Sequence, residues 1–150
     1  MKDNELNWKK VYESDLPNIV EDVRDFVELP SVIVLSGEVG AGKTTFSKAF
    51  INQGETSSPS YSLINEIGNT AHADLYRLET SDDIVHLEIP LYLEEKEFFL
   101  VEWGKQYLSV LKKLIPDEYS YYELEISCNK TSSTDSSTSS RNYRLTTIIV

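Results

Sequence analysis

Apolar positions along the chain recur with two different periods, and their order predicts an α/β protein. Short runs rich in β-branched or aromatic residues predict strands at residues 31–36 and 97–103. Apolar residues spaced three and four positions apart predict helices over residues 16–27, 44–51 and 105–115. Because strands here alternate with helices, the chain is expected to form a sheet with helices packed against it.

Weaker patterns predict the remaining elements. Further strands are expected at residues 6–12, 61–67, 70–76, 119–127 and 143–150. A short helix is expected to begin at Ser81 and to be stopped by Pro90. The Ser/Thr-rich segment 131–140 is expected to join the last two strands as a solvated, mobile hairpin loop.

The most specific motif lies between the strand at 31–36 and the helix at 44–51. Residues 37–44 read Gly-Glu-Val-Gly-Ala-Gly-Lys-Thr, which fits the Walker A pattern of a phosphate-binding loop. Its glycines permit positive φ angles and a close approach of the backbone to a phosphate. Its successive amides can form an anion nest ahead of a helix N-terminus. The alternative is a glycine-rich turn that only connects two elements, and the strand–loop–helix order disfavours it.

The motif predicts a site for ATP and Mg²⁺. Lys43 is expected to reach the β- and γ-phosphates and to be catalytic, and the Thr44 hydroxyl is expected to ligate Mg²⁺. The loop residues expected to hold the nucleotide are Gly37, Glu38, Val39, Gly40, Ala41, Gly42, Lys43, Thr44 and Thr45.

Two acidic residues are candidates for the rest of the site. A P-loop ATPase requires an acidic group for Mg²⁺ and a group that positions the attacking water. Glu102 follows an apolar strand directly, and Asp74 lies between Ala73 and Leu75 in a less apolar strand. Both acids are predicted to be catalytic, one on the metal and one on water. Glu102 is the expected metal ligand together with Thr44, and Asp74 is its rival for that role. For each acid, the alternative is an ordinary surface or helix-capping residue.

Neighbouring residues admit two interpretations each. His72 is expected to be a structural hydrogen-bonding residue rather than a base. Trp103 either stacks near the nucleotide or belongs to the core. Arg77 either neutralises charge in the transition state or pairs with a nearby carboxylate. Residues 58–62 lie where a switch loop would sense the γ-phosphate, although Pro59 and its serines are equally typical of a plain turn.

Composition narrows the class of protein. The chain has 150 residues, 40% of them hydrophobic, which suits one domain spanning residues 1–150. Its net charge of −11 argues against extensive direct contact with nucleic acid and favours a basic protein partner. An alternative function is a small-molecule or nucleoside kinase. The scarcity of arginine argues against it, because such enzymes normally bring several arginines to the transferred phosphoryl group.

Cysteine usage and the N-terminus indicate the compartment. Cys128 is the single cysteine, so no internal disulfide can form, which is usual in the reducing cytosol. The first residues lack the apolar core of a signal peptide, and no apolar run is long enough to span a bilayer. A cytoplasmic protein without a membrane partner is therefore expected.

Four blocks of sequence are distinctive in combination. They are the Walker block 37–46, residues 58–63 reading Ser-Pro-Ser-Tyr-Ser-Leu, residues 72–78 reading His-Ala-Asp-Leu-Tyr-Arg-Leu, and residues 101–103 reading Val-Glu-Trp. In this order they resemble the TsaE family, also called YjeE, whose members are bacterial ATPases of tRNA threonylcarbamoyladenosine biosynthesis. The family usually has threonine where this chain has serine in the second block.

The resemblance implies a three-layer P-loop fold whose mixed sheet is parallel at its centre and antiparallel at its flanks. It implies slow ATP hydrolysis that depends on two partner proteins, TsaB and TsaD, in the modification of adenosine 37 of tRNAs reading codons that begin with A. On the matched positions, Asp74 and Glu102 are the essential acids, Ser60 replaces the switch-loop threonine, and Trp103 lies close to the nucleotide. Contact with tRNA is expected to be only indirect.

Overall fold

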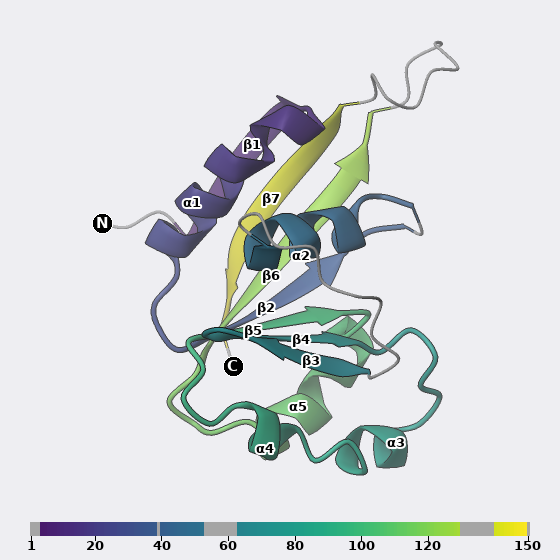
Figure 1. Ribbon diagram of the computed structural model, residues 1–150. Helices are drawn as coiled ribbons and strands as arrows, with labels where there is room; N and C mark the ends of the chain where they lie inside the picture. The colour runs from purple at the N-terminus through teal and green to yellow at the C-terminus, as the bar shows by residue number, and fades with distance from the viewer. Residues whose placement is uncertain (1–3, 39, 53–62, 130–139, 150) are drawn as a thin grey trace.

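The computed structural model of the chain describes residues 4–38, 40–52, 63–129 and 140–149 (Figure 1). Its strands are β1 (Glu5–Val11), β2 (Ser31–Ser36), β3 (Ile64–Ile67), β4 (Thr70–Asp74), β5 (Phe98–Glu102), β6 (Ser120–Cys128) and β7 (Arg141–Ile148). Its helices are α1 (Leu16–Phe26), α2 (Lys43–Asn52), α3 (Ser81–Val85), α4 (Ile89–Tyr92) and α5 (Leu108–Leu114), with short 3-10 turns at Glu13–Asp15 and Lys105–Tyr107.

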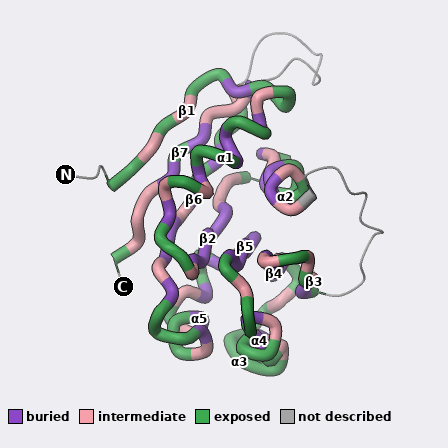
Figure 2. The backbone as a smooth tube through the Cα atoms, turned by 60° about the vertical axis from the view of Figure 1, so that its left-hand side comes forward, coloured by how far each residue is buried: buried purple, intermediate pink, exposed green. Residues whose placement is uncertain are grey.

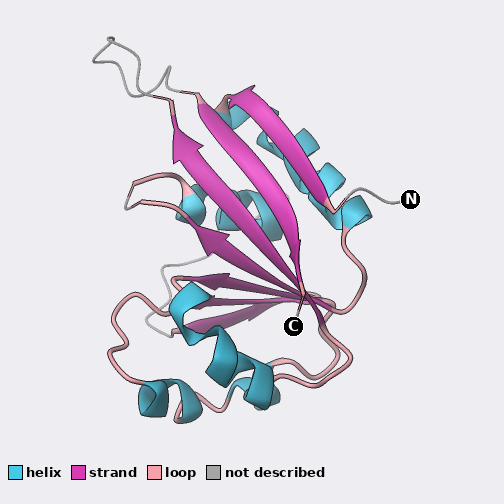
Figure 3. Ribbon diagram, turned by 180° about the vertical axis from the view of Figure 1, so that it is seen from behind, coloured by secondary structure: helices cyan, strands magenta, loops and turns pink. Residues whose placement is uncertain are grey.

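The described strands form one seven-stranded sheet in the order β1-β7-β6-β2-β5-β4-β3. β2 runs parallel to both β5 and β6, and β4 runs parallel to β5, so the centre of the sheet is parallel. β3 is antiparallel to β4, β7 to β6, and β1 to β7. This is the expected mixed sheet, and its strands fan out with a strong twist (Figure 3).

The two central strands are buried on both faces. Every residue of β5 is buried, and in β2 only Ser36 is partly exposed. Strands covered on both faces have continuous apolar sequences, which explains why these two runs were the clearest strand signals in the chain. Figure 2 shows this buried centre between helices whose outer surfaces are exposed.

Helices cover the sheet on both faces and complete the three layers (Figure 1). α1 and α2 pack over one face, on side chains that include Ile33 and Leu100. α3, α4 and α5 pack over the other face, on the alternating side chains that include Val34 and Phe99. In the part of the chain that the structure describes, none of the helices has the length and apolar character that crossing a bilayer requires.

The prediction that Pro90 stops a helix was wrong. The helix that begins at Ser81 ends already at Val85, and Pro90 lies in the first turn of a separate helix, α4. Proline is tolerated there because the N–H groups of a first turn have no partner within the helix. Between the two helices, Glu88 adopts a left-handed φ of 55° and redirects the chain.

Strand β4 ends two residues earlier than its pattern predicts. Asp74 Oδ1 accepts a hydrogen bond from the backbone N–H of Tyr76 at 3.1 Å, and such a side-chain turn replaces strand pairing. Asp74 therefore lies at the carboxyl end of β4, where it is opposite Glu102 of β5. Because β2, β4 and β5 are parallel, the Walker segment and both acids emerge at the same edge of the sheet.

Tyr143 of β7 provides a test of the packing under α2. Its ring lies 6.0 Å from the ring of Phe46 in α2, and burial raises the pKa of Tyr143 to about 12. An unfolded chain ionises tyrosine near pH 10. Between about pH 10 and 12 the folded chain therefore binds more protons than the unfolded chain, and the stability contributed by Tyr143 must fall as pH rises.

We expect Tyr143→Phe to make the alkaline loss of stability shallower by about 1 kcal/mol per pH unit, because the variant has no phenol to ionise. Urea denaturation at several pH values between about 9.5 and 11.5 measures the slope. Burial also raises the pKa of Tyr121 to about 12, so Tyr121→Phe should give a similar change on the other face of the sheet. An unchanged slope in Tyr143→Phe would show that this phenol is not buried.

Candidate functional site

The segment between β2 and α2 lies close against β6. Gly37 has a φ of 146°, and a Cβ added to it would lie 2.4 Å from the backbone oxygen of Ile126. Only glycine fits such an approach. Gly40 also has a positive φ, 83°, but an added Cβ would meet open space. The backbone N–H of Ala41 donates to the carbonyl of Glu38 at 3.0 Å, which closes the turn.

The Lys43 side chain folds back into this loop. It is 5% exposed, and Nζ donates to the carbonyls of Gly37 at 2.6 Å and Glu38 at 2.9 Å. The ammonium also lies 4.1 Å from the ring centre of Trp103, within the range of a cation–π interaction. Burial lowers the pKa of Lys43, and two nearby carboxylates partly oppose this effect. The loop thus holds a desolvated cation at its centre.

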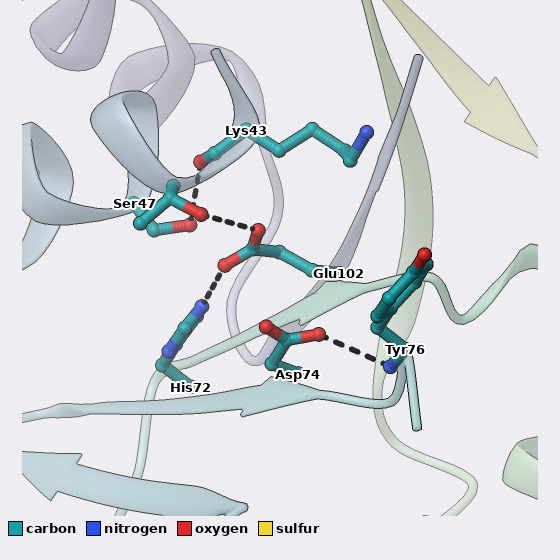
Figure 4. Close-up of polar contacts among 7 residues, drawn as sticks. Lys43, Ser47, His72, Asp74, Tyr76 and Glu102 are labelled. Carbon is teal, nitrogen blue, oxygen red and sulfur yellow. Dashed lines mark hydrogen bonds and ion pairs between the residues drawn. The ribbon is translucent and has the colours of Figure 1, made fainter. Parts of the chain in front are cut away.

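Glu102 is a buried carboxylate at the end of β5, with 2% of its surface exposed. Its Oε1 accepts a hydrogen bond from the Thr44 hydroxyl at 3.0 Å, and its Oε2 lies 2.6 Å from His72 Nε2 (Figure 4). Burial of a carboxylate is costly unless both oxygens have partners. Side chains from α2 and β4 therefore meet on Glu102, and His72 has the hydrogen-bonding position that was expected for it.

Asp74 differs from Glu102 in its surroundings. It is only partly buried, and its Oδ1 accepts a hydrogen bond from the Tyr76 N–H. No hydrogen bond to Oδ2 is found among the residues that the structure describes. The two acids lie opposite each other in the register of β4 and β5 (Figure 4). One of them is held on both oxygens, and the other has an oxygen available.

Trp103 lies between the core and the loop. Its φ of 62° turns the chain directly after β5. The partly buried ring packs against the core between the sheet and the helices α3, α4 and α5. Its centre lies 5.0 Å from the centre of the Tyr76 ring. On the other side it contacts the Lys43 ammonium. The ring therefore belongs to the core, and stacking near the nucleotide, the other interpretation of the sequence, stays a prediction.

Two contacts of the loop were not predicted. The buried Ser47 hydroxyl donates to the Lys43 carbonyl at 3.0 Å. Arg141 of β7 donates from Nε to the Ala41 carbonyl at 2.5 Å. Arg141 and Ala41 are 100 positions apart in the chain, so no local motif marks the contact. The scarcity of arginine was the only sequence signal that could have drawn attention to this residue.

Some expected site residues lie outside the described part of the chain. These are Val39 in the loop and the segment 58–62, which includes Ser60. Thr45 is described and is exposed in the first turn of α2. Arg77 is also exposed, and the ion pair considered for it is not found within the described ranges.

Of the Ser/Thr-rich segment 131–140, the structure describes only Ser140. Ser140 is 4% exposed, and its hydroxyl accepts a hydrogen bond from Asn129 Nδ2 at 3.0 Å. The expectation of a solvated loop up to residue 140 was therefore wrong for Ser140, because pairing across the β6–β7 hairpin already includes it.

Oxygen donors suited to Mg²⁺ lie next to the Walker loop. The Thr44 hydroxyl and the Glu102 carboxylate are 3.0 Å apart, with Asp74 on the neighbouring strand. Mg²⁺ prefers such hard oxygen ligands and usually takes one or two from protein, with water and phosphate supplying the others. Among the described residues, no group of three or more His, Cys, Asp or Glu could hold a metal. The donor set fits Mg²⁺ bound together with a phosphate group.

Comparison with known proteins identifies the family. Residues 11–138 match the family described as "Threonylcarbamoyl adenosine biosynthesis protein TsaE". The chain belongs to the TsaE family. A relative in Bacillus subtilis (strain 168), named tRNA threonylcarbamoyladenosine biosynthesis protein TsaE, is 30% identical over 122 residues. That match covers 76% of this chain and 73% of the relative.

Two further relatives carry the same name. The TsaE of Haemophilus influenzae is 31% identical over 88 residues, which are 53% of this chain and 56% of that protein. The TsaE of Aquifex aeolicus is 36% identical over 80 residues, which are 47% of this chain and 60% of that protein. The chain thus spans a little over half the length of these two relatives.

A solved structure supports the fold. The crystal structure of YdiB from Bacillus subtilis superimposes with a TM-score of 0.57 at 23% identity, covering 95% of this chain and 85% of that one. The expected TsaE family and the expected P-loop fold, with a parallel centre and antiparallel edges, are therefore confirmed. The roles of individual residues at the Walker loop remain predictions.

A methyl group should lower the free energy of unfolding far more at Gly37 than at Gly40. In Gly37→Ala the new Cβ would collide with the Ile126 backbone oxygen, so we expect the free energy of unfolding to fall by about 2 kcal/mol or more. Gly40→Ala is the matched control in the same loop and should cost about 1 kcal/mol, for its positive φ alone. Urea denaturation measures both variants, and equal losses would contradict the close approach at Gly37.

Proposed function

We propose that this TsaE-family chain is an ATP-binding and ATP-hydrolysing subunit of tRNA threonylcarbamoyladenosine biosynthesis. It acts in the cytoplasm with TsaB and TsaD in the modification of adenosine 37 of tRNAs that read codons beginning with A, and it contacts tRNA only indirectly. The observation that carries the proposal is the convergence of Lys43, Thr44 and Glu102 on a Walker loop.

The polyphosphate of ATP would bind at the loop amides and Lys43. Lys43 Nζ already lies within the loop, hydrogen-bonded to the carbonyls of Gly37 and Glu38. Anionic phosphate oxygens are stronger acceptors for an ammonium group than neutral carbonyls, so they can replace these partners. The N-terminus of α2 adds partial positive charge at the same place. Binding would therefore exchange one set of acceptors for another and leave no buried charge unpaired.

Thr44 and Glu102 would hold Mg²⁺. The ion supplies charge neutralisation on the phosphate oxygens. His72 contacts Glu102 through Oε2 and so fixes the orientation of the carboxylate, which is how outer partners commonly orient metal ligands.

Asp74 would orient the attacking water. Its Oδ1 is tied to the Tyr76 N–H, which fixes the carboxylate, and Oδ2 has no hydrogen-bond partner in the described part of the chain. A carboxylate oxygen that is fixed and available is suited to accept a hydrogen bond from water. Glu102 would instead hold the ion through Oε1, which lies 3.0 Å from the Thr44 hydroxyl, while His72 fixes Oε2.

Dependence on partner proteins is supported by charge. Phosphoryl transfer develops negative charge that cationic side chains stabilise, often from a second protein. Within the described residues, Lys43 and Arg141 are the cationic side chains that hydrogen-bond to the loop. The net charge of −11 favours association with a basic protein surface, which can bring a further cation to the phosphates. Hydrolysis by the chain alone is therefore expected to be slow.

Trp103 should report phosphate binding, because its ring lies 4.1 Å from the ammonium that the phosphates would attract. The chain has two tryptophans, so Trp8→Phe leaves Trp103 as the single reporter. We expect a saturable change in its fluorescence on titration with Mg·ATP. Adding Lys43→Ala should weaken binding by at least about tenfold, and calorimetry separates lost binding from lost signal. Wild-type affinity in Lys43→Ala would contradict the assigned phosphate site.

The two acids should be separable by experiment. Asp74→Ala and Glu102→Ala are each expected to lower ATP hydrolysis, assayed with TsaB and TsaD, by about 100-fold or more. Glu102→Ala should also raise the Mg²⁺ concentration needed for half-maximal activity, whereas Asp74→Ala should leave it unchanged. Glu66→Ala, which removes a half-exposed carboxylate of β3 that pairs with Lys96, is the control and should behave as wild type. Full activity in either acid variant would reassign that acid to a structural role.

A further inference from the structure

The end of the β6–β7 hairpin lies directly against the Walker loop. Ile126 of β6 limits the space at Gly37 through its backbone oxygen. Arg141 of β7 limits the space at Gly42, where an added Cβ would lie 3.0 Å from Nε and 3.1 Å from Cδ of Arg141. The same Nε donates to the carbonyl of Ala41 at 2.5 Å. Arg141 therefore contacts two successive residues of the loop.

This hydrogen bond sets the direction of a loop amide. The Ala41 carbonyl and the Gly42 N–H belong to one planar peptide group, and in a trans peptide they point in opposite directions. A carbonyl held toward Arg141 therefore directs the Gly42 N–H away from β7. Gly42 has a φ of 115°, and a glycine at such an angle has several other conformations open to it. A charged donor restrains it more strongly than a neutral one.

Arg141 differs from the other arginines in what it contacts. Arg24 lies with its guanidinium 4.2 Å from the ring centre of Phe50 and donates to the Phe50 carbonyl at 2.8 Å, so it belongs to the packing of α1 on α2. Arg144 is exposed on β7 and pairs with Glu5 of β1 at 2.9 Å. Arg141 and Arg144 thus form a matched pair: they share a strand, and only Arg141 contacts the loop.

We propose that Arg141 is a positioning residue for phosphate binding, which holds the Ala41–Gly42 peptide so that the Gly42 N–H points at the polyphosphate. The inference rests on the proposed function, because it requires the polyphosphate to bind on this loop. A residue that orients the loop without touching the reacting atoms acts mainly on affinity. Its loss should therefore appear in the dissociation constant and in KM, and much less in kcat.

The test compares Arg141→Ala, Arg141→Lys, Arg144→Ala and the wild type. Calorimetry gives the dissociation constants of Mg·ATP and of inorganic tripolyphosphate, and steady-state assays with TsaB and TsaD give KM and kcat. We expect Arg141→Ala to weaken both ligands by about tenfold, the effect of one charged hydrogen bond, and to raise KM by a similar factor. We expect kcat to change by less than about twofold.

The two remaining variants separate charge and fold from geometry. Arg141→Lys keeps the charge without the fixed fork of the guanidinium, so it should lose about threefold in affinity, less than Arg141→Ala. Arg144→Ala should bind both ligands as the wild type does. Circular dichroism and thermal unfolding establish that each variant is folded. If Arg141→Ala does not fold, the comparison of Arg141→Lys with the wild type decides the question.

Two results would overturn this role of Arg141. The first is unchanged dissociation constants in both Arg141 variants when the wild type binds both ligands. The second is a loss for Mg·ATP without a loss for tripolyphosphate, because Arg141 would then act on the base or the ribose. A wild-type protein that binds neither ligand would refute the proposed function itself, which distinguishes the two failures.

Discussion

The site at the carboxyl edge of the sheet contains a buried ammonium and a buried carboxylate, and it depends on the partners that stabilise each of them. Removing either charge from water costs several kcal/mol unless hydrogen bonds replace the lost hydration. The Lys43 ammonium donates to two loop carbonyls and lies over the face of the Trp103 ring. The Glu102 carboxylate is hydrogen-bonded to the Thr44 hydroxyl and to the His72 ring. The loop, α2, β4 and the turn after β5 all supply partners, so the full set is present only when the sheet and its helices are assembled.

The topology of the sheet explains why these elements meet. Parallel pairing of β2, β5 and β4 brings three carboxyl ends to one edge, and the register aligns Asp74 with Glu102. The antiparallel β6–β7 hairpin flanks β2 on the other side and places Arg141 against the loop. The parallel strands thus supply the acids, and the antiparallel flank supports the backbone that would bind phosphate.

The loop and its surroundings have the organisation that the proposed binding of a polyphosphate would require. Lys43 is desolvated, the Walker backbone is confined between α2 and the β6–β7 hairpin, and Glu102 is oriented on both oxygens. Preorganised charges and donors in a dry site interact more strongly with an anion than the same groups in water. At the proposed nucleotide site, Lys43 would exchange its two carbonyl partners for phosphate oxygens, while the surrounding elements keep their arrangement. The proposed hydrolysis would need additional positive charge, which an acidic protein can recruit from a basic partner.

The sequence alone determined the elements and motifs whose signals are local. The buried strands β2 and β5, the Walker loop and helix α2 follow from short-range apolar patterns and glycine spacing. The two candidate acids follow from their positions in or just after predicted strands. The family of the chain was predicted from motifs in their order along the sequence, and the comparisons confirmed it.

Only the tertiary structure decided which of these residues touch. Three contacts join residues that are distant in sequence. They are the hydrogen bond of His72 with Glu102, the cation–π contact of Lys43 with Trp103 and the hydrogen bond of Arg141 with Ala41. Periodicity reports which face of an element is buried, but not which element lies opposite, because strand order and register are set by long-range packing. The same reason applies to Pro90, since proline restricts a helix interior but leaves open whether a new helix begins around it.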